Sequence, residues 1–274
     1  NNVIPAEESE MVNRHVREHH CDLHLGTELA EIIDDGTGRV KAVKTNKGEV
    51  IECDWVGLTA GVKPNINFLK TSGIELGRGV VINEKFETSV PNVYAIGDCA
   101  QFKEAYPGRR NIEQVWYTGK MHGETVALNI TGTPKVYNPG IWFNSAKFFD
   151  IEYHIYGDVL ATLPEDEETL YWEGPDGRKS IRINYKKEGG VVTGFNLMGV
   201  RYRHKVCDKW LHEKRDIEYV LAHLSAANFD PEFSKENEPE LVALYEKKTG
   251  KKIKRKGRRS LMGMIFSKHS IAKS

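Results

Sequence analysis

The sequence predicts two kinds of architecture in one chain, an α/β region followed by an antiparallel α+β domain. Two observations carry this prediction. Up to residue 132, short apolar strands alternate with helical periodicity and end at glycine-containing turns. From about Tyr137, segments of alternating apolar and polar residues follow one another, as antiparallel strands do. The 274 residues suffice for two compact domains, since domains usually have about 100 to 200 residues.

The first half should begin with a helix at 6–19, where apolar side chains recur at three- and four-residue spacing. Asp35-Gly36 and Lys47-Gly48 supply turn residues for a β-meander. The elements expected after the first helix are strands at 22–25, 29–33, 40–45, 49–53 and 55–59, a short helix from Pro64 to Gly73, strands at 80–82 and 92–96, and a long helix at 112–130.

The second half should consist of strands followed by helices. Alternation predicts strands at 142–148, 152–156, 169–172, 180–185 and 191–199, with helices at 206–213, 217–224 and 239–247. The basic segment that follows is expected to be a flexible tail.

The overall composition is that of a globular protein. Hydrophobic residues make up 39%, charged residues 28% and aromatic residues 9%, and no apolar run approaches the roughly 20 residues of a spanning helix. The four cysteines form no Cys-x-x-Cys pair, which argues against a disulfide framework and favours a cytoplasmic location. Because the chain begins with Asn1 and shows no leader pattern, we expect it to start inside a longer gene product.

Charge is unevenly distributed along the chain. Residues 247–259 hold nine Lys or Arg and no acid, so the rest of the chain carries about nine excess acidic groups. A basic run beside apolar residues can bind polyanions or touch a membrane surface. A solubilising tail is the simpler interpretation. We expect no nucleic-acid binding, and at most a weak membrane-surface contact by this tail.

The most specific motif is Thr-Ser-Val-Pro-Asn-Val-Tyr-Ala-Ile-Gly-Asp at residues 88–98. An apolar strand that delivers Gly97 and Asp98 allows close backbone approach and offers a carboxylate to a polyol. Gly-Asp alone would equally fit a strand followed by a helix-capping Asp. The whole pattern resembles the pyridine nucleotide-disulfide oxidoreductase superfamily, and the resemblance implies that Asp98 accepts a hydrogen bond from a ribityl hydroxyl of FAD.

A second stretch with the same resemblance lies upstream. Residues 54–65, with Thr59-Ala60-Gly61 and Pro64, resemble the strand and turn where the family returns from its NAD(P)H domain to its FAD domain. The family more often has Ala-Thr-Gly at this point. The resemblance implies that Gly61 lies close to the cofactor.

The expected helix at 112–130 resembles the family helix whose amino end points at the flavin ring. Free N–H groups and partial positive charge at such an end suit the negative charge that reduction places near flavin N1. Ile112, Glu113 and Gln114 are therefore candidate cofactor-binding residues. A glycine-bearing packing helix without a ligand is the alternative.

Residues 141–150 resemble the start of the carboxy-terminal domain in the NADH oxidase, ferredoxin reductase and nitrite reductase-like branches. The resemblance implies that Trp142 or Phe143 covers a flavin or nicotinamide face, and that this domain forms a homodimer contact. Aromatic residues at such spacing are also common in plain cores.

The family binds the ADP parts of FAD and NAD(P)H with two Gly-x-Gly-x-x-Gly loops, and this sequence contains neither. The expected organisation is therefore partial Rossmann-like domains followed by the α+β domain. Its segments are 1–60, the later half of an NAD(P)H-binding domain; 61–132, the later part of an FAD-binding domain; 133–228, an interface domain; and 229–274, a helical segment with the basic tail.

The resemblance implies an FAD-dependent oxidoreductase that passes hydride from NAD(P)H to flavin and onward to a small molecule or redox protein. The chain by itself is expected to be inactive and to hold little FAD. A non-enzymatic binding or dimerisation module with an inherited flavoprotein fold is the alternative function.

A metal site is the rival hypothesis for the histidines near residue 20. Histidines four residues apart share a helix face, and imidazole suits zinc. His15, His19, His20 and His24 lie here with Cys21. The family resemblance places them on a surface helix, so we expect solvated or partly buried histidines and no metal.

Overall fold

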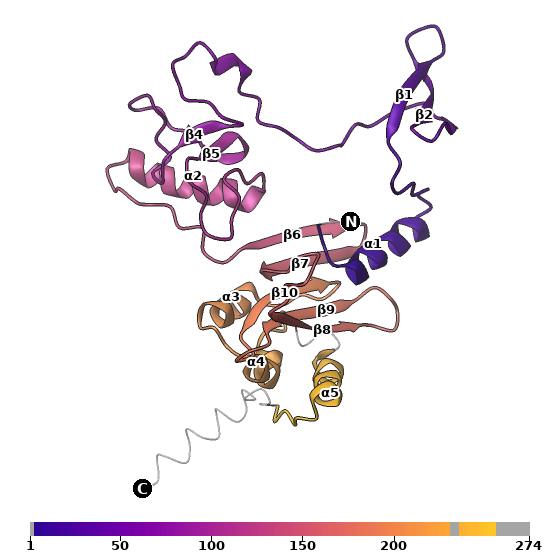
Figure 1. The fold of residues 1–274 in the computed structure, drawn as a ribbon, viewed down its shortest axis with the longest axis vertical. Helices are drawn as coiled ribbons and strands as arrows, with labels where there is room; N and C mark the ends of the chain where they lie inside the picture. The colour runs from indigo at the N-terminus through magenta and orange to yellow at the C-terminus, as the bar shows by residue number, and fades with distance from the viewer. Residues whose placement is uncertain (1–2, 231–235, 256–274) are drawn as a thin grey trace. The chain divides into compact units, whose positions relative to one another are not determined.

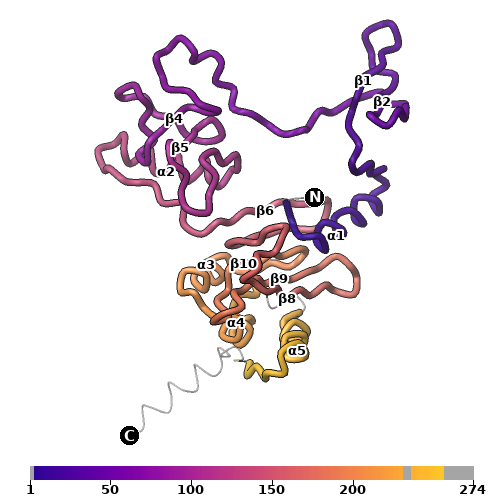
Figure 2. The backbone as a smooth tube through the Cα atoms, viewed as in Figure 1, coloured from indigo at the N-terminus to yellow at the C-terminus, as the bar shows by residue number. Residues whose placement is uncertain are grey.

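The computed structural model describes residues 3–230 and 236–255 and is drawn in Figures 1 and 2. The chain divides into two compact units, described separately below. One comprises residues 1–21 with 140–274, and the other residues 22–139. The expected combination of an α/β region and an α+β domain is confirmed. The functional boundaries near residues 60, 132 and 228 stay a prediction.

The first unit is built on one antiparallel five-stranded sheet with the order β6-β7-β10-β9-β8. All five strands were expected from the sequence, with ends that shift by one or two residues. They are β6 Phe143–Phe148, β7 Ile151–Gly157, β8 Glu167–Glu173, β9 Ser180–Lys186 and β10 Val192–Met198.

Both faces of this sheet are covered, by different helices (Figure 1). In β9, Ile181 and Ile183 point into one hydrophobic cluster, whereas Arg182 between them points to the opposite face and binds Glu8 of α1. Successive side chains of a strand alternate between faces, so one strand serves two environments. This explains why β9 is buried at nearly every position.

Helices α3 (His204–His212), α4 (Ile217–His223) and α5 (Glu238–Thr249) cover the first of these faces. Trp210, Val220 and Leu241 are at most 4% exposed there. Apolar burial at about 25 cal/mol per Å² is the main stabilising contribution of such a core.

Helix α1 (Ala6–Glu18) packs against the opposite face of the sheet. Its Met11 is fully buried with Ile151 and Ile155 of β7. The helix begins after Pro5, and Glu7 and Glu8 in its first turn complement the positive end of the helix dipole.

The basic segment begins inside α5. Residues 247–249 complete α5, and Lys251, Lys252 and Arg255 pair with acidic side chains at 3.3 Å or less. These pairs are exposed and stabilise the fold little. The helix thus runs two residues past its expected end at Lys247, and the flexibility expected for the residues after it stays a prediction; residues 256–274 lie outside the described residues.

The second unit contains two small sheets. Strands β1 (Leu29–Asp34), β2 (Val40–Thr45) and β3 (Val50–Glu52) form an antiparallel meander, as expected. Strands β4 (Val80–Ile82) and β5 (Ala100–Phe102) pair in parallel. Helix α2 (Trp116–Ile130) shares a core of Ile82, Phe86, Phe102, Val126 and Tyr137 with this pair.

Several expected elements of this unit are wrong. Residues 22–25 and 55–59 form no strand, 92–96 contribute only an isolated bridge at Tyr94, and the helix expected from Pro64 is a 3-10 turn, Asn67–Leu69. A strand needs a hydrogen-bonded neighbour, and neither 22–25 nor 55–59 has one among the described residues. Trp55 is 80% exposed and Leu58 73%. The strand was expected because an apolar run usually indicates burial, whereas these side chains are largely exposed in the described structure.

The four cysteines are free thiols, as their spacing suggested. Cys207 is fully buried, and burial raises the pKa of its thiol well above the ordinary value. Within the described ranges, every helix is too short or too polar to cross a membrane. The cellular location stays a prediction.

Candidate functional site

The Gly97-Asp98 turn occupies a 3-10 turn, Gly97–Cys99, directly ahead of β5. Gly97 has a φ of +72°, a conformation that side chains other than glycine disfavour. A Cβ placed there would meet nothing within 4 Å, so the space in front of this backbone is open. Asp98 is exposed, and among the described residues its carboxylate has no hydrogen-bond or ion-pair partner. A ligand can therefore approach both residues.

His122 of α2 holds this turn in place. The backbone N–H of Gly97 donates a hydrogen bond to His122 Nδ1 at 3.2 Å. The ring is 2% exposed and lies among Phe86, Phe102 and Tyr137. Desolvation in this aromatic setting lowers the pKa of His122 to about 4, against an opposing effect of Glu113 and with a smaller contribution from Arg109. The neutral imidazole that accepts from Gly97 is thus the stable form at neutral pH.

The glycine-bearing face of α2 approaches the same turn. A Cβ on Gly119 would lie 3.7 Å from the Cα of Gly97, and one on Gly123 would lie 4.0 Å from the Ile96 side chain. The first turns of α2 therefore pack directly behind the Gly97-Asp98 backbone.

The helix begins four residues later than the sequence indicated. Val115 is its N-cap, with extended φ and ψ of −134° and 142°, and Trp116 is its first residue. Ile112, Glu113 and Gln114 therefore lie in the segment that leads to the helix and do not form its first turn. The expected helix start at 112 is wrong because side-chain contacts of Glu113 organise this segment in another way.

Glu113 is held by a buried ion pair. Arg109 Nε and Nη2 donate to the two carboxylate oxygens of Glu113 at 2.5 and 2.6 Å. Thr118 in the first turn of α2 donates to the same carboxylate at 3.0 Å. The side chains of Arg109 and Glu113 are 10% and 11% exposed. Such a bidentate pair fixes the direction of the chain where it enters the helix, and Glu113 also places negative charge near the positive end of α2.

A cavity of about 680 Å³ joins the two stretches that the sequence singled out. Val62, Lys63 and Pro64 border it from the turn after Gly61, while Ile112 and Gln114 border it from the segment before α2. Besides Lys63, two more positively charged side chains line the cavity, those of Arg78 and Arg110. Within the described part of the chain, no carboxylate pairs with Lys63, Arg78 or Arg110. The cavity therefore combines apolar walls with uncompensated positive charge.

The remaining predicted site residues lie in different places. Gly61 is exposed, has a φ of +100°, and has open space where a Cβ would be. Trp142 belongs to the other compact unit, where it is half-buried and packs against the hydrophobic cluster that contains Met11. Its role near a flavin stays a prediction. His122 and Arg109 were not predicted, because a single histidine or arginine in a helical or turn segment carries no distinguishing spacing.

Comparison with known proteins finds a family model, relatives and solved structures that are similar to parts of this chain. Residues 2–123 match the family model described as "Pyridine nucleotide-disulphide oxidoreductase". The NAD(P)H sulfur oxidoreductase (CoA-dependent) of Pyrococcus furiosus is 34% identical over 182 residues, which are 65% of this chain and 38% of that protein. The 5,5'-dehydrodivanillate O-demethylase ferredoxin reductase subunit of Sphingobium sp. is 30% identical over 178 residues, which are 65% of this chain and 42% of that protein.

Among solved structures, the fold is similar to that of a NAD-dependent persulfide reductase from A. fulgidus. The TM-score is 0.68 at 19% identity, and the match covers 90% of this chain and 49% of the other. Residues 2–123 are therefore similar to the pyridine nucleotide-disulphide oxidoreductase family, and relatives of the chain carry the names of NAD(P)H- and FAD-dependent oxidoreductases. The chain spans less than half the length of the relatives named above.

Proposed function

We propose that this chain supplies the flavin-facing part of an FAD-dependent NAD(P)H oxidoreductase. The cationic cavity between the turn after Gly61 and the segment before α2 is the observation that supports this most. Flavin binding needs apolar contact for the ring together with positive charge near its N1 and C2 carbonyl, and the lining of this cavity contains three apolar and three positively charged side chains.

Each residue of the site has a distinct part in this proposal. The Asp98 carboxylate accepts a hydrogen bond from a ribityl hydroxyl, and Gly97 lets the backbone come close. Ile112 and Pro64 provide apolar contact, while Arg110 and the amino end of α2 favour negative charge. When bound, FAD supplies a centre that takes hydride from NAD(P)H and releases electrons to an acceptor.

The segments of the chain are assigned accordingly. Residues 1–60 correspond to the later half of an NAD(P)H-binding domain, 61–132 to FAD-binding elements, 133–228 to an interface domain, and 229–274 to a helical segment with a basic end. Because no Gly-x-Gly-x-x-Gly loop is present to cradle a pyrophosphate, the 274 residues alone should bind FAD weakly and turn over little NAD(P)H.

We propose that the electron acceptor is a small molecule or a redox protein. Related proteins carry both kinds of name: a sulfur oxidoreductase in Pyrococcus furiosus and a rhodocoxin reductase in Rhodococcus erythropolis. We further propose that the domain from 133 to 228 forms a homodimer contact. The alternative, a binding module without catalysis, predicts no flavin even in the complete gene product.

The assignment of the cavity to flavin is tested by comparing Arg110→Glu with Lys70→Glu in the full-length gene product. Both residues are exposed cations of the same unit, but only Arg110 borders the cavity. Flavin content is read from visible absorbance, and NADH or NADPH oxidation is followed with ferricyanide. Loss of flavin in Arg110→Glu but not in Lys70→Glu supports the proposal. Equal flavin in both variants contradicts the cavity assignment, and absence of flavin from the unaltered protein supports the non-enzymatic module.

A further inference from the structure

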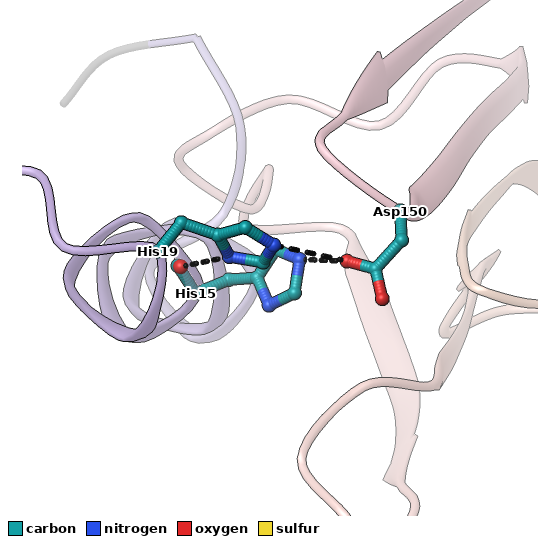
Figure 3. Close-up of side chains that lie close together, drawn as sticks. All are labelled: His15, His19 and Asp150. Atoms are coloured by element: carbon teal, nitrogen blue, oxygen red, sulfur yellow. Dashed lines mark hydrogen bonds and ion pairs between the residues drawn. The ribbon is translucent and has the colours of Figure 1, made fainter.

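A cluster outside the proposed flavin site brings three metal-ligating groups together (Figure 3). His15 and His19 are four residues apart on α1, and Asp150 lies in the turn between β6 and β7. One ligand atom from each of the three residues lies within 4.8 Å of the other two. We propose that these residues form a binding site for a divalent zinc-like cation, which joins α1 to the sheet.

The orientation of the His19 ring is the first argument. Its Nδ1 lies 2.9 Å from the carbonyl oxygen of His15. A carbonyl oxygen can only accept, so Nδ1 carries the hydrogen, and the neutral ring presents its Nε2 lone pair to Asp150 Oδ1 at 3.7 Å. Two acceptors facing each other need a proton or a cation between them. The carbonyl contact of Nδ1 is also the usual outer-sphere arrangement of a metal-bound histidine.

The His15 ring converges on the same oxygen. His15 Nε2 contacts Asp150 Oδ1 in a side chain that is only 2% exposed. The buried Nδ1 has no hydrogen-bond partner, and the nearest carboxylate oxygen, of Glu18, is 3.6 Å away. Both imidazoles therefore direct Nε2 at one carboxylate oxygen, as Figure 3 shows.

The turn that carries Asp150 is shaped for this contact. Phe149 is the first of its two residues and has a φ of +56°, where tight hairpins favour glycine. This conformation stacks the Phe149 ring on His19, with centroids 4.1 Å apart and planes inclined by 16°. The stacking fixes the plane of the ligand ring.

Charge and space are compatible with a cation. Arg178 pairs with the other oxygen of Asp150 at 3.3 Å and with Glu18 at 3.4 Å, so it does not occupy Oδ1, which the two histidine Nε2 atoms face. With neutral imidazoles, Asp150, Glu18 and Arg178 sum to one negative charge. Ligand atoms around tetrahedral zinc are about 3.3 Å apart, given bonds of about 2.0 Å. Because His15 Nε2 and Asp150 Oδ1 contact each other directly, a cation between them requires the carboxylate to move outward, which its position in a turn and its 58% exposure allow.

The test is a Zn²⁺ titration of the untagged chain by calorimetry, with Co²⁺ absorbance between about 500 and 650 nm reporting on coordination. The expected result is one site, weakened at least tenfold by His19→Ala and by Asp150→Asn. Asp150→Asn alters an exposed turn and should leave the fold intact. Saturating Zn²⁺ should raise the thermal midpoint of the unaltered chain but not that of Asp150→Asn.

Two controls separate this site from other ligands. His212→Ala removes an exposed helical histidine that also has an aspartate four residues away, and it should leave the affinity unchanged. Cys21→Ser, which removes the exposed thiol next to the cluster, should also bind normally. The proposal is overturned if His19→Ala and Asp150→Asn bind Zn²⁺ as tightly as the unaltered chain, or if Cys21→Ser abolishes binding.

Discussion

The N–H of Gly97 donates a hydrogen bond to Nδ1 of His122 at 3.2 Å, so a buried imidazole sets the backbone of the turn that carries Asp98. Nδ1 of His122 can accept this hydrogen bond only while the ring is neutral. The geometry of the proposed flavin contact is therefore coupled to the protonation of a residue that would not touch the flavin's ribityl chain.

The first prediction is a loss of local stability in acid. The pKa of His122 is about 4 in the folded chain and 6.5 for an unperturbed histidine. A depressed pKa means that the stabilisation is complete above pH 6.5 and declines as the pH falls through 4. Between pH 7 and 4.5 the opening free energy of α2 should fall by about 2 kcal/mol. Hydrogen exchange of residues 116–130 measures this.

His122→Leu is the matched control for that experiment. Leucine cannot titrate, so the acid-dependent part of the exchange should disappear, although the variant is less stable at pH 7. An identical pH dependence in both proteins would show that other groups cause the acid sensitivity.

The second prediction concerns the buried pair of Arg109 and Glu113. Glu113→Ala removes the carboxylate that binds two nitrogens of the Arg109 guanidinium and should lower the free energy of unfolding by about 3 kcal/mol. Glu124→Ala removes an exposed carboxylate that pairs with Lys120 on the same helix, and it should cost under about 0.5 kcal/mol. Urea unfolding followed by hydrogen exchange at 109–130 compares the two, and equal effects would refute the structural role of the buried pair.

The third prediction is that α1 depends on Arg182. Glu8 is fully buried, and Arg182 donates to its two oxygens at 2.7 and 2.9 Å. Arg182→Met removes the guanidinium that pairs with the buried Glu8 carboxylate. Hydrogen exchange in residues 6–18 should rise by an amount equivalent to about 3 kcal/mol of opening free energy. Arg14→Met breaks a half-exposed pair with Glu173 and should change exchange far less. Undisturbed exchange in Arg182→Met would mean that α1 is held by its apolar contacts alone.

The fourth prediction is self-association. The aromatic start of the domain that follows residue 133 leaves Phe149 46% exposed, and aromatic side chains are enriched in interfaces. Sedimentation of the full-length gene product should show a dimer at micromolar concentration. A monomer at high micromolar concentration would contradict the proposed contact.

The parts of the fold that the sequence predicted are those with local signals. The five strands of the larger sheet follow from two-residue alternation and turn residues, and Gly97 with Asp98 follows from a contiguous motif. The strand predicted at 55–59 is wrong because an apolar run usually indicates a buried strand, whereas Trp55 and Leu58 are largely exposed and have no neighbouring strand among the described residues. The late start of α2 at Trp116 was missed because the side chain of Glu113 bonds to Arg109 and Thr118, a contact that periodicity does not encode.

Prediction of the candidate site had the same limit, because sequence patterns do not encode contacts between separate side chains. His122 and Arg109 act through contacts with residues 25 and 4 positions away, and neither has a distinctive sequence neighbourhood. The His15, His19 and Asp150 cluster needs two segments 135 residues apart. Sequence spacing supplied the two histidines, but only the fold supplied the carboxylate, so the sequence alone favoured no metal.

The most direct test of the flavin assignment is the FAD dissociation constant of Asp98→Ala in the full-length gene product, beside Glu104→Ala as an exposed carboxylate of the same unit. Removal of a charge-assisted hydrogen bond should weaken FAD binding by roughly tenfold or more in Asp98→Ala. Glu104→Ala should bind as the unaltered protein does. Flavin fluorescence during dilution and rebinding measures both constants. An unchanged affinity in Asp98→Ala would contradict the assignment of the Gly97-Asp98 turn to the ribityl chain.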